Sequence, residues 1–260
     1  MNNTFNIQRF GLLLKRQWLE FGKIYLITLA VALGVLITFY GFSLKNVITE
    51  EYGFTPRVLQ FREPLFLIFG FLFITVIASS YFAHLGQKPK AIIDLMIPAS
   101  TFEKFLTGVI FTAVLSTLSF VLIFYLTDLA FIAKVKAISS NYNQEATYFF
   151  AKNSPKEFHS IYVIIPMFVT SIFLAGSIYF NKFHYIKTAI SVMIFSGLWA
   201  FLIYKTGQLL FEGKVRVEQV SMNTNDAPKG WIELGVFAVF LLLTAIFWTI
   251  TYVRLKEKQV

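Results

Sequence analysis

The sequence predicts an all-α integral membrane protein with about six transmembrane helices, and three observations support this prediction. Of the 260 residues, 57% are hydrophobic and 18% are aromatic, with 31 phenylalanines among them, and the mean hydropathy is +0.66. A soluble domain of this size would expose much of that apolar surface to water and aggregate, whereas lipid accommodates it. Charged residues make up only 14% of the chain and are concentrated between long apolar runs.

Six apolar runs are long enough to cross a hydrocarbon core about 30 Å thick, which takes about 20 helical residues. They are approximately Ile24–Leu44, Pro64–Leu85, Phe105–Ala133, Ile161–Phe180, Thr188–Phe211 and Trp231–Val253. Tyrosine and tryptophan residues bracket four of these runs, as expected for rings that prefer the lipid headgroup level. The sequence therefore predicts a six-helix transmembrane domain over residues 24–260, preceded by residues 1–23.

The segment before the first run has two interpretations. Apolar residues recur at helical spacing along it while charged residues fall on the opposite side. The apolar residues are Ile7, Phe10, Leu14, Trp18 and Phe21, and the charged residues are Arg9, Arg16 and Glu20. Such a helix would lie in the membrane interface as an elbow helix. Alternatively, the segment is the start of a long first helix.

Basic residues near the first run favour a cytoplasmic N-terminus. Four of them precede the run, namely Arg9, Lys15, Arg16 and Lys23, and the first helix usually dominates orientation. With six spans, both termini are then expected on the cytoplasmic side of the cell membrane. Because the leader is charged and the run is of full spanning length, we expect an anchor rather than a cleaved signal peptide.

Composition and motifs exclude several classes of function. The formal charge of +9 resides in the loops, which favours an anionic lipid surface over a nucleic-acid partner. The absence of cysteine excludes thiolate metal sites and cysteine nucleophiles. The three histidines, His84, His159 and His184, are predicted to lie too far apart for a shared metal, and no hydrolase motif occurs. We therefore expect no catalytic residues, metal or cofactor on this chain.

The loop over residues 86–104 contains a helix-start signal. The stretch over residues 91–97 is short and apolar with a single acidic residue, and Pro98 ends any helix before it. Ser100 and Glu103 then have the spacing of a capping box. The sequence thus predicts a short helix, a break and a strongly initiated third span.

The stretch Asp94-Leu-Met-Ile-Pro-Ala-Ser-Thr-Phe-Glu-Lys-Phe-Leu106, together with the overall plan, resembles the membrane subunits of ABC-2-type ABC transporters. That family has an elbow helix, six spans, cytoplasmic termini and a short cytoplasmic helix between spans two and three. In that family the external segment before the last span is often apolar, whereas residues 212–230 here are largely polar.

The resemblance implies a permease subunit, working in export as a homodimer or heterodimer, with a separate ATP-binding ABC subunit as partner. ATP would bind to that partner, and no Gly-x-x-x-x-Gly-Lys-[Ser/Thr] phosphate loop occurs in this sequence. The resemblance implies that the helix around residues 92–96 docks on the ATPase. The residues that it assigns to coupling with the ATPase are Ile92, Ile93, Asp94, Met96, Pro98 and Glu103.

Other interpretations remain open. The loop over residues 86–104 could be an ordinary connection, in which case the chain is a noncatalytic scaffold or accessory subunit of a larger membrane complex. Asp128 either lies below the external interface and lines a pathway, or marks the outer end of a span that ends earlier. An ion-coupled transporter is disfavoured because the predicted spans lack paired charges and Gly/Pro-broken helices.

Overall fold

The computed structural model describes residues 5–49, 55–86, 92–94, 96–139, 146–152, 161–211 and 229–258, and no strand occurs within these ranges. The described elements are, in order, α1 (Ile7–Ile48), η1 (Pro56–Phe61), α2 (Arg62–Tyr81), η2 (Ala83–Gly86), α4 (Thr101–Val109), the π-helical turn η3 (Ile110–Leu115), α5 (Ser116–Ser139), α6 (Phe149–Lys152), α7 (Ile161–Tyr179), α8 (His184–Phe211) and α9 (Lys229–Lys258).

Five of these helical rods are long and apolar enough to cross a membrane, which confirms the predicted fold class. They are Ile7–Ile48, Arg57–Tyr81, Thr101–Ala137, His184–Gln208 and Leu234–Lys258. The remaining predicted span corresponds to α7, which has 19 residues and therefore a length of about 28 Å. The chain is thus an all-α, multi-pass membrane protein.

The N-terminal segment does not form a helix of its own. Residues 7–21 begin α1, which runs for 42 residues without a break at residue 23. At about 1.5 Å per residue, α1 is about 63 Å long, twice the hydrocarbon thickness. No helix boundary therefore occurs at residue 23: as in the second interpretation of this segment, a single helix contains residues 7–23 and the first span, because no proline interrupts it and Gly22 does not end it. The location of residues 7–23 in the membrane interface stays a prediction.

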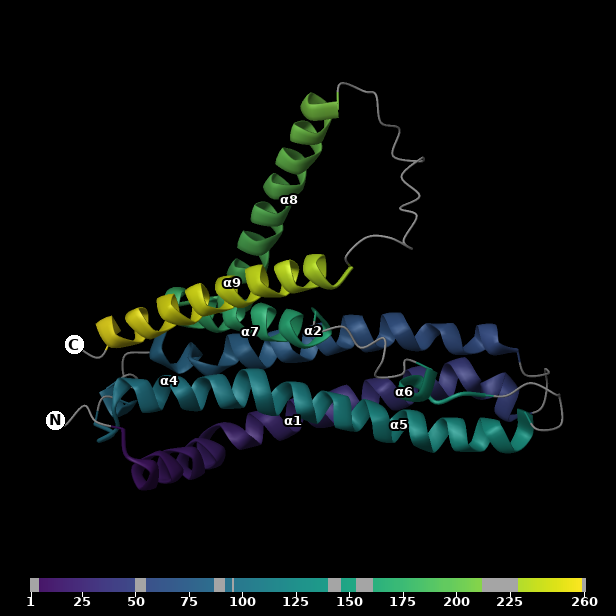
Figure 1. Cartoon of the computed structure of the whole chain (residues 1–260). Coiled ribbons are helices and arrows are strands. Elements are labelled where there is room, and N and C mark those ends of the chain that lie inside the picture. The colour runs from purple at the N-terminus through teal and green to yellow at the C-terminus, as the bar shows by residue number, and fades with distance from the viewer. Residues whose placement is uncertain are drawn as a thin grey trace.

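The helices form a bundle from which α8 departs (Figure 1). One group contains α1, α2 and the rod made of α4, η3 and α5, and α7 lies between α2 and α9. By contrast, α8 points away from the bundle at a steep angle, and only 6% of its most apolar stretch is buried. The start of α1 and the end of α9 lie at the same end of the bundle, which we call the terminal end, and the opposite end is the distal end.

Close packing between α7 and α8 depends on one glycine. A Cβ atom at Gly176 would lie 2.0 Å from the Thr188 hydroxyl oxygen and 2.9 Å from the Thr188 Cβ. Rotation of the threonine cannot relieve both contacts, since its own Cβ is fixed by the backbone. Small residues at such positions let membrane helices approach closely.

We expect Gly176→Ala to destabilise the protein by about 1–3 kcal/mol through overpacking. Gly197→Ala is the matched control, because a Cβ at Gly197 meets nothing within 4 Å and alanine favours the helix. Thermal unfolding of the two purified variants in detergent measures the difference. Equal melting temperatures would contradict the close approach of α7 and α8.

Candidate functional site

The loop between α2 and α4 presents an apolar surface at the terminal end. Ile92, Ile93 and Met96 are 58%, 56% and 79% exposed, and Pro98 is also exposed. Residues 92–94 are helical, and the Met96 amide donates to the Ile92 carbonyl at 3.2 Å, so a helical turn is present. Residues 87–91 and 95 of this loop lie outside the described part of the chain.

An ion pair ties this loop to the first turn of α4. The Lys104 ammonium donates to the Asp94 backbone carbonyl at 2.6 Å and to its carboxylate at 3.2 Å. Lys104 is only 7% exposed, so the contact is largely shielded from water. The helical turn therefore cannot move far without pulling on α4.

The predicted capping box at the start of α4 is confirmed. The Glu103 amide donates to the Ser100 hydroxyl at 3.2 Å, and the Ser100 amide donates to the Glu103 carboxylate at 2.9 Å. Two amides that the helix would leave unpaired are thereby satisfied. The third span accordingly begins at Thr101.

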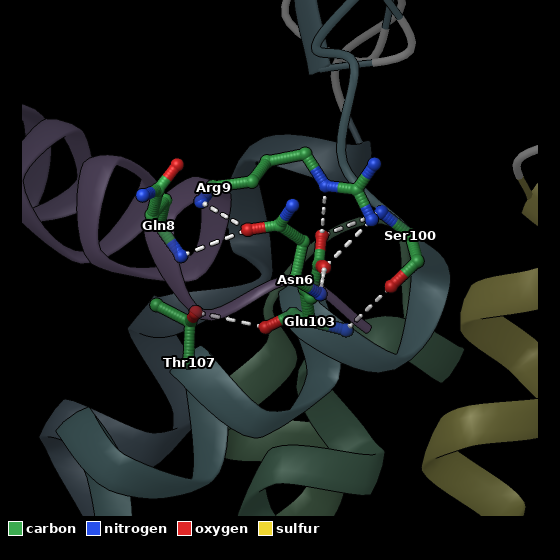
Figure 2. A network of polar contacts seen from close by, with 6 residues as sticks. All are labelled: Asn6, Gln8, Arg9, Ser100, Glu103 and Thr107. Carbon is green, nitrogen blue, oxygen red and sulfur yellow. Dashed lines mark hydrogen bonds and ion pairs between the residues drawn. The ribbon is translucent and has the colours of Figure 1, made fainter. Parts of the chain in front are cut away.

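Glu103 also clamps the start of α4 to the start of α1 (Figure 2). The Arg9 guanidinium donates through Nε at 2.8 Å and through its terminal nitrogen at 2.7 Å, and the Asn6 amide adds a bond of 2.9 Å. Bidentate charge-assisted bonds of this kind are among the strongest hydrogen bonds in proteins. Asn6 in turn caps α1 by accepting from the Gln8 amide at 2.9 Å.

This geometry shows how Glu103 is held, and its assignment to coupling with an ATPase stays a prediction. The residue is fully buried, with 0% exposure, and its carboxylate accepts from Arg9, Asn6 and Ser100. These contacts fix the position of the first turn of α4. The spacing of the capping box identified the contacts of Glu103 with Ser100, whereas the ion pair with Arg9, 94 residues away in sequence, left no local signal.

Behind the loop lies a cavity of about 10 Å³ lined in part by Gln17, His84, Asp94 and Lys104. Such a volume holds roughly one water molecule. The cavity is therefore too small for a transported molecule.

A second polar network surrounds Asp128 toward the distal end. One carboxylate oxygen accepts from the Arg62 guanidinium at 3.0 Å and from the Tyr40 hydroxyl at 2.9 Å. The other accepts from the Phe149 amide at 2.8 Å. Arg62 also donates to the Thr147 carbonyl at 3.1 Å. These bonds join α1, α2 and α5 to the segment that contains α6.

The Arg62–Asp128 pair corrects the expectation that the spans lack paired charges. Both side chains are buried, with 4% and 2% exposure, which is costly for charges unless they are paired. Sequence reasoning missed Arg62 because it placed the start of the second span at Pro64, two residues later. Asp128 is surrounded by donors, and its assignment to a pathway stays a prediction.

The described residues contain no group of three His, Asp or Glu side chains that could hold a metal ion. His159 lies outside them. No family model matches the chain, and neither a curated protein nor a solved structure is significantly similar to it.

We expect Glu103→Ala to lower stability by about 1.5–3 kcal/mol, because the Arg9 charge and two amides lose their acceptor. A double-mutant cycle with Arg9→Gln and Glu103→Gln, measured by denaturant unfolding, isolates the energy of the pair. The matched control is the exposed Arg16–Glu20 pair, 2.8 Å apart on the same helix, for which we expect about 0.3–0.5 kcal/mol. Equal coupling energies in the two pairs would contradict the clamp.

We expect Asp128→Asn to destabilise the protein by about 3–5 kcal/mol, since it leaves the Arg62 charge buried and unpaired. The double variant Arg62→Met/Asp128→Asn removes both charges and keeps an acceptor at position 128. It should therefore unfold at a higher temperature than Asp128→Asn alone. A single variant as stable as the wild type would show that the pair is not buried as described.

Proposed function

We propose that this chain is the membrane-spanning permease subunit of an ABC-2-type exporter, driven by a separate ATPase subunit. The observation that carries the proposal is the exposed apolar turn of Ile92, Ile93 and Met96, held on a rigid base. Exposed apolar side chains at the water-facing end of a membrane protein favour a protein partner. In this assignment the terminal end is cytoplasmic, and two copies or two related subunits form the pathway.

The two ties at the base of the turn support a mechanical role. A push on Ile93 reaches α4 through the Asp94–Lys104 pair, and it reaches α1 through the Glu103–Arg9 clamp. Both are charge-assisted contacts within 3.2 Å. A loop that merely connected two spans would not need to be fastened to a third helix.

The ATPase is proposed to act from outside, with ATP bound only by that partner. Its docking groove should be apolar where it receives Ile93 and Met96. Asp94 is 19% exposed in its side chain and is occupied by Lys104, so its main part is to hold the turn in place. The pathway itself would lie between subunits, and Asp128 is proposed to border it at the distal end.

The first experiment is to purify the tagged chain in mild detergent from its own host and identify the associated proteins by mass spectrometry. The proposal expects a stoichiometric ATPase that carries a phosphate loop. A reproducible complex without any ATPase would instead support a noncatalytic scaffold.

We expect Ile93→Asp/Met96→Asp to abolish association with that ATPase while leaving the protein folded, because both side chains are exposed. The control is Phe183→Asn, a change at another exposed apolar residue (71%), in the turn between α7 and α8. Phe183 has φ 55°, a conformation that asparagine tolerates. Copurified ATPase is quantified for each variant. Retention of the ATPase by the double variant would place the docking site elsewhere.

A further inference from the structure

The third span contains one turn of π-helix. This turn, η3, joins α4 to α5 without interrupting the helical rod. Hydrogen bonds in a π turn run from i to i+5 instead of i+4, so the turn holds an extra residue, and such turns are frequent at functional sites. Residues of α5 are therefore displaced by one position from the register that α4 alone would set.

Three buried hydroxyl groups bond to backbone carbonyls of the rod around this turn. Thr107 donates to the Glu103 carbonyl at 2.8 Å, Thr112 donates to the Gly108 carbonyl at 2.8 Å, and Ser116 donates to the Thr112 carbonyl. Side-chain bonds of this kind slightly destabilise a helix and often bend it. The first of these carbonyls belongs to Glu103, the residue that clamps α4 to α1.

Side chains from α1 and α2 contact the π turn from two sides. The Tyr25 hydroxyl lies 3.1 Å from the Leu115 carbonyl oxygen and 2.6 Å from the Ser119 hydroxyl. The Phe111 ring packs 6.0 Å from the Tyr81 ring. These contacts fix the position of the π turn, so the turn is part of the packed helix bundle.

The rod is anchored on both sides of the π turn. Glu103, before the turn, is bound to Arg9, and Asp128, after the turn, is bound to Arg62. A uniform α-helix would carry a rotation at Glu103 directly to Asp128 and strain the distal network. An extra residue between the two anchors allows α4 to rotate while α5 stays in place.

We propose that η3 is a hinge that uncouples the rotation of α4 from α5. Its role in coupling rests on the proposed permease function, in which the ATPase moves the loop and hence α4. The presence of an extra residue in the π turn does not depend on that function. The hinge therefore has a structural test and a functional test, which can fail separately.

The structural test is the deletion of Val114, which is 44% exposed and lies within the π turn. Deletion should convert the turn to α-helix and leave α5 in its place, so the melting temperature should stay within about 4 °C of the wild type. The matched control is the deletion of Leu122, which is 57% exposed and lies in regular α5. It should turn the following residues by about 100°, separate Asp128 from Arg62 and abolish folded, monodisperse protein. An equal loss of folded, monodisperse protein in both deletion variants would contradict the presence of an extra residue in the π turn.

The functional test measures ATP hydrolysis by the complex purified from the host. Deletion of Val114 should leave the ATPase bound but remove its response to the permease, whereas Val114→Ala should retain that response. A full response in the folded deletion variant would overturn the hinge. Absence of any ATPase from the wild-type complex would overturn both the permease proposal and the hinge's role in coupling. The two deletions would still show whether the π turn contains an extra residue.

Discussion

The bidentate ion pair between Arg9 and Glu103 determines how the terminal end of the protein is built. The Glu103 carboxylate also accepts from the amides of Asn6 and Ser100, so one buried anion fixes two helix starts. A buried carboxylate without these donors would be strongly unfavourable. The first and third spans must therefore come together at this point, and the loop that carries Ile93 rests on the junction.

The network around Asp128 is the counterpart of the Arg9–Glu103 pair, because both carboxylates belong to the rod made of α4, η3 and α5. Asp128 of α5 brings together the Arg62 guanidinium, the Tyr40 hydroxyl and the Phe149 amide, as Glu103 does for its own donors. The second half of the bundle is joined differently, by close packing at Gly176 and by the Lys258 ammonium, which donates to the Ile178 carbonyl at 2.6 Å. Charged contacts thus define the α1–α2–α5 group, while α7 and α9 pack onto it.

Patterns among neighbouring residues predicted the structural features that depend on neighbouring residues alone. Apolar runs of spanning length and the spacing of Ser100 and Glu103 predicted the helices and the start of the third span. The partners of Glu103 and Asp128 were not predictable, since Arg9 and Arg62 lie 94 and 66 residues away in sequence and ordinary basic residues flank every span. The π turn over residues 110–115 had no local signal in the sequence either.

Site-directed cross-linking in native membranes tests the proposed docking of the turn of Ile92, Ile93 and Met96 on an ATPase. The chain has no cysteine, so Ile93→Cys carries a single thiol to which a photoreactive cross-linker can be attached. We expect one major product, containing an ATPase with a phosphate loop, whose yield changes when ATP is added. Cross-linking of Ile93→Cys only to lipid, or to proteins without an ATPase fold, would contradict it.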